Sequence, residues 1–189
     1  QGLVFAKTRL ARTHLFQADA RYLPYVEEFD LVGCFDVLEH VPQDIDVIRS
    51  MHAALRSNGM LFITVPQHAF LWSQFDEFSH HVRRYGRTEL RKKLEMAGFE
   101  IIRIGSFVSL LFPALVASRA RRSRNSSRRV LAPEEIAKRA LKDLCPTLAI
   151  NLLLSLIMTI ERALIQIGVN FPFGGSLFVV CKKKTLTIH

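Results

Sequence analysis

Two carboxylates and an imidazole follow a short apolar run, Leu31–Val37, in the first quarter of the chain. The run has the length and the β-branched and aromatic content of a strand that is buried on both faces. At its end lie Asp36, Glu39 and His40, where carboxylates can accept hydrogen bonds from a ligand and an imidazole can act as a general base near neutral pH. Ligands of open α/β sheets bind beyond the carboxyl ends of the strands, so the pattern predicts a ligand site here.

A helix and a second strand are predicted to position this polar group. Residues Asp44–Arg56 repeat apolar side chains at helical spacing, and Asn58-Gly59 supplies a left-handed stop. Met60–Val65 follows as a second buried strand. Consecutive strands joined by a helix run parallel, so both strand ends should meet at one edge of the sheet. The cleft predicted there also contains Pro66, Gln67 and His68, and the apolar helix face consists of Val47, Ile48, Met51, Ala54 and Leu55.

A second polar segment follows the second strand. It contains Trp72, Asp76, Glu77, His80, His81, Arg83, Arg84 and Tyr85. In a sheet of this type the segment covers the cleft, so its side chains are candidates for substrate contact. The alternative is that Arg83 and Arg84 pair with Asp76 and Glu77 and only fix the loop. No metal site is predicted, because the adjacent His80 and His81 should point apart and no third ligand is evident.

Several of these segments, taken in order, resemble one enzyme family. The motifs are Gln17–Ala20, Phe29–Val32 leading to Asp36–Val41, Leu55–Gly59, Thr64–Pro66, His81–Tyr85 and a helix Thr88–Ala97 closed by Gly98-Phe99. Together they resemble the class I S-adenosylmethionine-dependent methyltransferases, and the later motifs are similar to the type 11 branch. The resemblance covers roughly residues 1–107 and a final strand, Leu177–Lys182. It implies an α/β fold with a partial Rossmann-like methyltransferase sheet, and S-adenosylmethionine as the cofactor.

The resemblance also implies roles for single residues. Asp19 would accept a hydrogen bond from the adenine amino group while the Ala20 amide donates to the ring, although Asp19 could instead cap a turn. The cofactor-binding residues implied at the first strand are Phe35, Asp36, Val37 and Glu39. Glu39 and His40 could also act by fixing the loop.

Methyl transfer is an in-line displacement that depends mainly on positioning. If the acceptor is a hydroxyl, His81 or His40 would serve as general base. The residues expected to bind the acceptor are Pro66, Trp72, His80, Arg84 and Tyr85.

The sequence departs from the family at its amino-terminal end. The family's acidic residue with a glycine-rich turn, and the later acid that holds the ribose, have no counterpart here, and Gly2 is the only glycine before Gly33. We therefore expect the chain to be the carboxyl-terminal part of a longer protein, with loss of activity as the alternative. A strand at Thr13–Ala18 would then lack its native neighbours.

The block between Ile104 and Gly168 is unusually apolar and basic. Ile104–Ser118 and Leu148–Ile160 are apolar runs shorter than the ~20 residues of a membrane-spanning helix. A helix at Leu148–Gln166 would need cover, and packing in the core or against a second subunit is favoured over a lipid surface. Between the runs, six arginines in Arg119–Arg129 predict a mobile loop and contribute to the net charge of +9. Membrane contact is favoured over nucleic acid there, because no aromatic residues are interleaved.

Three regions are therefore expected: a methyltransferase core at 1–107, an apolar helical insertion with a basic loop at 108–170, and the final strand and tail at 171–189. The predicted function is methyl transfer to a small-molecule or lipidic acceptor. The alternatives are an inactive binding module and a membrane-surface protein. Cys34, Cys145 and Cys181 lack Cys-x-x-Cys spacing, so we expect reduced thiols and a cytoplasmic location. Association of the cytoplasmic protein with a membrane is the alternative location.

Overall fold

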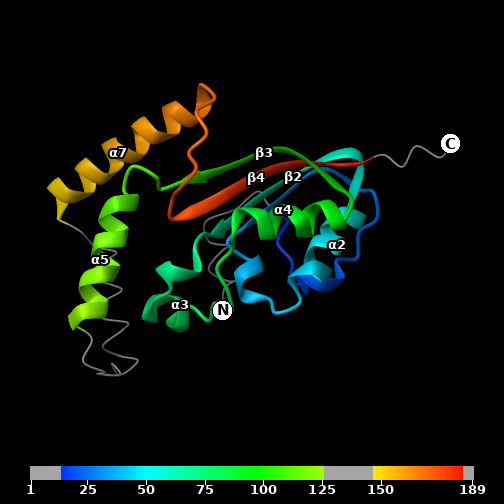
Figure 1. Ribbon diagram of the computed structural model, residues 1–189. Helices are drawn as coiled ribbons and strands as arrows, with labels where there is room; N and C mark the ends of the chain where they lie inside the picture. The colour runs from blue at the N-terminus through cyan, green and yellow to red at the C-terminus, as the bar shows by residue number, and fades with distance from the viewer. Residues whose placement is uncertain (1–13, 126–146, 185–189) are drawn as a thin grey trace.

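A four-stranded sheet forms the centre of the computed structural model, which describes residues 14–125 and 147–184 (Figure 1). The strand order is β1-β2-β4-β3. Strands β1 and β2 are parallel, whereas β4 is antiparallel to both β2 and β3. The predicted α/β class, the parallel pair and the final strand are confirmed. The strand bounds are Phe29–Phe35 (β1), Leu55–Pro66 (β2), Phe99–Phe107 (β3) and Ser176–Lys183 (β4).

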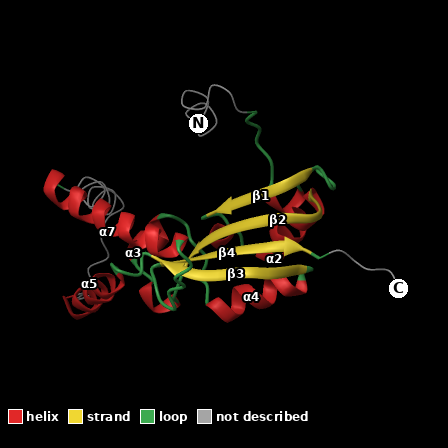
Figure 2. Ribbon diagram, turned by 90° about the horizontal axis from the view of Figure 1, so that it is seen from above, coloured by secondary structure: helices red, strands yellow, loops and turns green. Residues whose placement is uncertain are grey.

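The helices fall into two groups. Helices α2 (Asp44–Ala54) and α4 (Arg87–Met96) cover one face of the sheet. Helices α3 (Gln74–Phe78), α5 (Phe112–Asn125) and α7 (Leu148–Gln166) gather at the end of the sheet toward which β1 points (Figure 2). Single turns of 3-10 helix lie at Ala20–Tyr22 (η1), Leu38–His40 (η2) and Ala69–Leu71 (η3).

The main core lies between the sheet and α2 with α4. The predicted apolar face of α2 is buried, and it packs against side chains that alternate along β2 and β4. Helix α2 ends at Ala54, two residues earlier than predicted, because Leu55 is already extended (φ −79°, ψ 140°) and starts β2. Asn58 has the expected left-handed conformation (φ 65°), but it lies within β2 and does not end the helix. The sheet residues facing these helices include Leu61, Ile63, Val65, Leu177 and Val179.

Strand β1 is not buried on both faces, so that prediction is wrong. Leu31 is 59% exposed and Phe35 is 62% exposed, whereas Cys34 on the opposite face is buried. The reason is that β1 is an edge strand and, among the described residues, helices cover only the face toward α2 (Figure 2). Residues 14–18 form no strand, and Thr13 lies outside the described residues.

The apolar run Ile104–Ser118 divides between the end of β3 and the start of α5. Pro113 is tolerated at the second position of α5, in the first turn, where the helix does not need its amide hydrogen. The arginine-rich segment is helical as far as Asn125, so a loop from Arg119 onward is wrong for that part. Residues 126–129, and Cys145, lie outside the described residues.

Helix α7 has the predicted bounds but not the expected cover. Among its 19 residues, all described, only Glu161 is buried, so the expectation that α7 belongs to the core is wrong. Glu161 Oε2 accepts hydrogen bonds from the amides of Ser109 and Leu110, each at 2.8 Å. Arg103 donates to the carbonyls of Ile165 and Val169, each at 2.9 Å. These polar contacts therefore anchor α7 to the domain, while its apolar side chains are at most half-buried.

Candidate active site at the edge of the sheet

The ends of β1 and β2 meet at one edge, as the sequence predicted. The amide of Asp36 donates to the Thr64 carbonyl at 3.0 Å, and the Thr64 hydroxyl donates to Asp36 Oδ1 at 3.3 Å. The segment after α3 closes over this edge, where the Val82 amide donates to the Glu39 carbonyl at 2.8 Å and Arg84 Nη1 donates to the Gln67 carbonyl at 3.2 Å. Two strand ends and a covering segment thus form one site.

Three residues around this edge have left-handed backbone conformations. Asp36 has φ 52°, His68 has φ 63° and His80 has φ 57°. Such conformations are uncommon for residues other than glycine and tend to occur at functional sites. The geometry of the edge is therefore maintained against a local conformational cost.

Glu39 is a buried carboxylate at the centre of the edge. Its side chain is 1% exposed, and Oε2 has no hydrogen-bond partner. Burial raises the pKa of Glu39 to about 7, and the nearby charge of Asp36 raises it further. A hydrogen bond between the Glu39 side chain and its own backbone, and the charge of Arg84, lower the pKa and offset part of this rise. A carboxyl with such a pKa can gain or lose a proton near neutrality.

Asp76 organises the covering segment from a fully buried position. It accepts from the Ser73 amide and hydroxyl at 2.8 Å each, and its Oδ1 lies 3.0 Å from His81 Nδ1. Arg84 Nε donates to the same carboxylate at 2.8 Å. Burial would raise the pKa of Asp76, but the hydrogen bonds from Arg84 and Ser73 outweigh it and the net shift is downward. The loop-fixing alternative therefore describes Arg84, while Arg83 pairs with Asp44 instead.

His81 lies against His40, not against its sequence neighbour His80. The two rings meet edge to face with centroids 4.7 Å apart. Ligand atoms of Glu39, His40 and His81 all lie within 4.8 Å of one another. The sequence indicated each of these residues, but it could not show that η2 and the segment after α3 bring them together.

Tyr85 is fully buried, which corrects its predicted contact with the acceptor. Its hydroxyl donates to Asp44 Oδ2 at 2.7 Å and approaches the Leu38 carbonyl at 3.2 Å. Asp44 is also bound by Arg83 at 3.0 Å and Lys93 at 2.5 Å. Sequence reasoning missed Asp44, because an acid in the first turn of a helix is expected from the helix dipole alone.

The remaining acceptor candidates are spread along the covering segment. Pro66 is buried, and its carbonyl accepts from the Tyr85 amide at 2.9 Å. Trp72 donates to Glu77 at 3.3 Å and is partly exposed, as is the surface residue His80. Pro66 thus supports the loop, while Trp72 and His80 remain accessible to a ligand.

The residues implied for the cofactor line the neighbouring surface. Asp19 caps η1 by accepting from the Arg21 amide at 3.0 Å, and hydrogen bonds from the Arg21 side chain and backbone lower its pKa to about 2. Arg21 Nη1 donates to Gln43 Oε1 at 3.2 Å, which ties η1, beginning at Ala20, to the loop after β1. Phe35 at the end of β1, and Asp36 and Val37 on the loop that follows, are exposed. The Asp19 carboxylate and the exposed apolar surface near one edge fit the polar and apolar parts of S-adenosylmethionine. The contacts that the structure gives for Asp19 itself are those of a turn cap.

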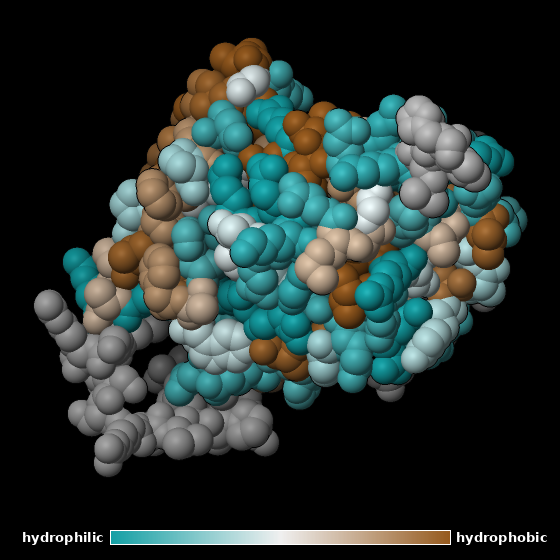
Figure 3. Space-filling view, turned by 45° about the vertical axis from the view of Figure 1, so that its right-hand side comes forward, coloured by the Kyte–Doolittle hydropathy of each residue, from teal (hydrophilic) through white to brown (hydrophobic). Residues whose placement is uncertain are grey.

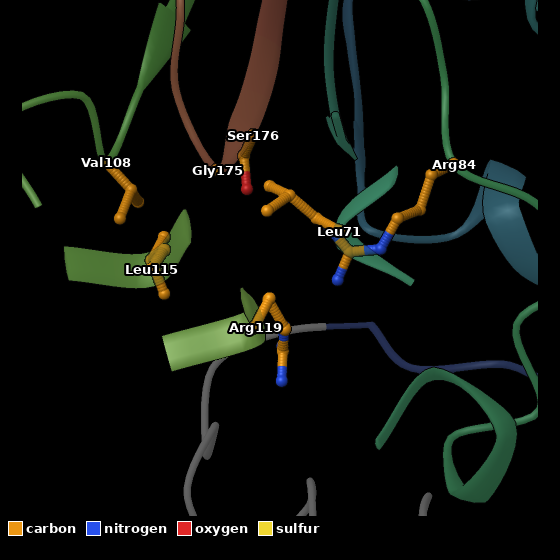
Figure 4. A pocket seen from close by; sticks show the side chains of 7 residues that line it. All are labelled: Leu71, Arg84, Val108, Leu115, Arg119, Gly175 and Ser176. Carbon is orange, nitrogen blue, oxygen red and sulfur yellow. The ribbon is translucent and has the colours of Figure 1, made fainter. Parts of the chain in front are cut away.

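A small cavity opens beside this edge, between η3, α5 and the start of β4 (Figure 4). Its volume is about 160 Å³, below the 300–1,000 Å³ that is usual for ligand pockets. Arg84 and Arg119 contribute guanidinium groups, and the other lining residues are Leu71, Val108, Leu115, Gly175 and Ser176. Nearby, the centroid of the His68 ring lies 5.0 Å from that of Phe70 and 5.3 Å from that of Phe112. This part of the edge thus combines apolar side chains with two guanidinium groups, of which that of Arg84 is paired with Asp76.

Comparison with known protein families places this fold and its edge among the methyltransferases. The profile of the family described as "Methyltransferase domain" matches residues 5–104, and the chain belongs to that family. It is 34% identical over 70 residues to a ubiquinone biosynthesis O-methyltransferase from Histophilus somni (strain 2336), a match covering 37% of this chain and 29% of that protein. The chain thus matches less than a third of the length of this curated relative.

Solved structures agree on the fold. The [4+2]-cyclase SpnF superposes with a TM-score of 0.54 at 18% identity, covering 97% of this chain and 62% of that chain. A SAM-dependent methyltransferase from Thermotoga maritima superposes with a TM-score of 0.54 at 14% identity, covering 93% and 67%. At these identities the likeness establishes the fold alone.

Proposed function

We propose that the protein, in a form that also supplies the family's glycine-rich turn, transfers a methyl group from S-adenosylmethionine to a hydroxyl of a small or lipidic acceptor. The observation that carries the proposal is the polar edge after β1, where Asp36–His40 meets His81 within the segment matched by the family. The bound cofactor supplies the electrophilic methyl group. The protein supplies alignment, which provides most of the acceleration in such a displacement.

His81 is the residue best placed to act on the acceptor hydroxyl. Its Nδ1 is held by Asp76 at 3.0 Å, which leaves Nε2 to take the proton. This is the arrangement in which a carboxylate orients an imidazole for proton transfer. His40 lies against the same ring and is the second candidate for this role.

A lipidic acceptor is supported by the surroundings of the edge and by the relatives. The cavity combines two arginines with leucine and valine side chains, and aromatic rings lie next to it. The Histophilus somni relative is named for ubiquinone biosynthesis, which favours an oxygen acceptor with an apolar tail.

Methyl transfer is tested with labelled S-adenosylmethionine and a pair of catechols, one with and one without a prenyl tail. The 189-residue chain and an amino-terminally extended form are compared, and calorimetry measures how tightly each binds the cofactor. We expect the extended form to bind the cofactor and to prefer the prenylated catechol. In that form His81→Gln should lower turnover at least about 100-fold, while the control His14→Gln, on an exposed histidine that is not a candidate for the site, should not. Binding without transfer to either catechol would support the inactive-module alternative, and absence of binding by the extended form would refute the proposal.

A second proposal, for which α7 is the observation, is peripheral contact with an anionic membrane. Figure 3 shows hydrophobic side chains gathered over the part of the surface where α7 lies. Helix α7 is also long and apolar enough to cross a membrane, by length and composition alone. Because Glu161 and Arg103 hold it to the domain, we infer that it lies on the lipid surface. Basic residues of α5 such as the exposed Arg121 would add about 1 kcal/mol each near an anionic surface.

Sedimentation with vesicles tests this contact. We expect binding to vesicles with anionic lipid and not to neutral ones. Leu153→Asp on α7 should abolish it without unfolding the protein, because Leu153 is exposed. Met96→Asp, which changes an exposed apolar residue of α4, is the matched control and should bind like the wild type. Unfolding of Leu153→Asp, or equal loss in both variants, would contradict the proposal and favour burial of α7 against another protein surface.

A further inference from the structure

Glu39, His40 and His81 form a cluster of three side chains that can each bind a metal ion, whereas a general base needs only one imidazole. It presents one carboxylate and two imidazoles from two separate segments, η2 and the loop after α3. We propose that these three side chains form a binding site for a divalent first-row transition-metal ion at the carboxyl edge of β1.

The donor set fits such an ion. Two histidines and one carboxylate are the ligands of catalytic zinc sites and of non-haem iron sites, in which further coordination positions stay open. The donors lie within 4.8 Å of one another. Neighbouring donors of a tetrahedral ion, with bonds of about 2.1 Å, lie about 3.4 Å apart. Side-chain rotations that shorten the longest separation by up to about 1.4 Å would bring all three donors within reach of one ion.

Burial of Glu39 provides an independent indication of a ligand. The side chain is 1% exposed, yet Oε2 lacks a hydrogen-bond partner among the described residues. A buried carboxylate without partners is costly, and buried charges are usually paired or coordinate metals. A cation in the cluster would supply the missing partner.

Asp76 prepares His81 for this role. Metal-binding histidines commonly donate their second ring N–H to a carboxylate, which fixes the tautomer and the orientation of the ring. Asp76 Oδ1 lies 3.0 Å from His81 Nδ1, so Nε2 is the nitrogen left for the ion. Asp76 is itself held by Arg84 and Ser73, which makes the carboxylate rigid.

Such an ion would deepen the proposed methyl transfer, on which this part of the inference rests. With the ion bound, His81 Nε2 would be a ligand and the ion would replace His81 as the activating group. An acceptor hydroxyl at an open position would lose its proton to water more readily, because the ion would lower the pKa of that hydroxyl. The oxygen then forms a bond to the methyl carbon as the carbon–sulfur bond breaks. The products are the methyl ether, S-adenosylhomocysteine and the released proton.

The test measures Co²⁺ binding by the purified chain without cofactor or acceptor, so it does not depend on methyl transfer. We expect one Co²⁺ per chain with visible d–d absorption, displaced by Zn²⁺. His40→Ala and Glu39→Gln should each weaken binding at least tenfold, and Asp76→Asn should weaken it about 10–100-fold. His80→Ala is the matched control, since His40 and His80 are both exposed, and it should bind like the wild type.

Thermal unfolding followed by circular dichroism establishes that the variants are folded. Absence of Co²⁺ binding by the wild type, or equal weakening in His40→Ala and His80→Ala, would overturn the site. If Co²⁺ binds as expected and the catechol assay fails, the metal site stands and the methyl-transfer proposal falls.

Discussion

Replacing Tyr85 by phenylalanine separates a structural role for this residue from contact with the acceptor. The change removes only the hydroxyl, which donates to Asp44 Oδ2 at 2.7 Å in a fully buried position. The Leu38 carbonyl keeps the Val41 amide as a partner, so the main loss is one hydrogen bond to a charged group. Such bonds contribute about 1.5–3 kcal/mol.

Urea unfolding should show this loss as a lower midpoint at an unchanged slope. Because 1 kcal/mol corresponds to roughly 2–4 °C in a protein of this size, the melting temperature should fall by roughly 3–12 °C. Tyr25→Phe is the matched control, since no hydrogen bond to the Tyr25 hydroxyl is found within the described part of the chain. It should change stability by less than about 0.5 kcal/mol.

Cofactor affinity and turnover should be nearly unchanged in Tyr85→Phe of the extended form at temperatures where it is folded. Lower turnover with wild-type stability would refute the reasoning, because it would place the hydroxyl at the acceptor and not in the core.

Two further predictions concern other buried acids. Burial alone would raise the pKa of Asp44, but hydrogen bonds from Lys93 and Tyr85 lower it below the ordinary value of 3.8. Its contribution to stability is therefore present above that value and is lost as the pH falls through the folded-state pKa. Asp44→Asn should accordingly unfold at less urea at pH 7 and lose less stability than the wild type between pH 5 and pH 3; parallel pH curves would contradict this. For Glu161, which accepts from the Ser109 and Leu110 amides, substitution by alanine should speed hydrogen exchange of these two amides at least about tenfold, equivalent to 1.4 kcal/mol, by mass spectrometry. Glu161→Gln keeps an acceptor oxygen and should change them less, whereas equal effects of both variants would show that the charge is decisive.

The periodicity of apolar residues predicted the helices well where a single apolar face sets the spacing. The buried face of α2 and the bounds of α7 follow from spacing alone, because side chains repeat at helical intervals. Spacing says nothing about what covers an apolar surface, so the exposure of Phe35 and of α7 was missed. Local reasoning also failed for Tyr85, whose partner Asp44 is 41 residues away in the sequence.

The candidate site was predicted in composition but not in arrangement. Asp36, Glu39 and His40 were recognised because they follow a strand. Pairing of His40 with His81 depends on how the segment after α3 folds back, which is fixed by the buried carboxylate of Asp76. No sequence pattern distinguishes that role of Asp76 from ordinary helix capping, which it also performs.

The left-handed conformations of Asp36 and His80 bear on any attempt to make this protein more heat-resistant. Glycine adopts such conformations without steric cost, so random mutagenesis followed by selection for thermal survival should enrich glycine at both positions. The outcome should differ between them. Glycine at Asp36 would remove a carboxylate from the predicted cofactor surface, whereas glycine at His80 would leave the Glu39, His40 and His81 cluster intact. A selection that scores folding alone would therefore favour heat-resistant variants that have lost part of the predicted cofactor surface through the first position, whereas the second position offers the gain in stability with the cluster retained.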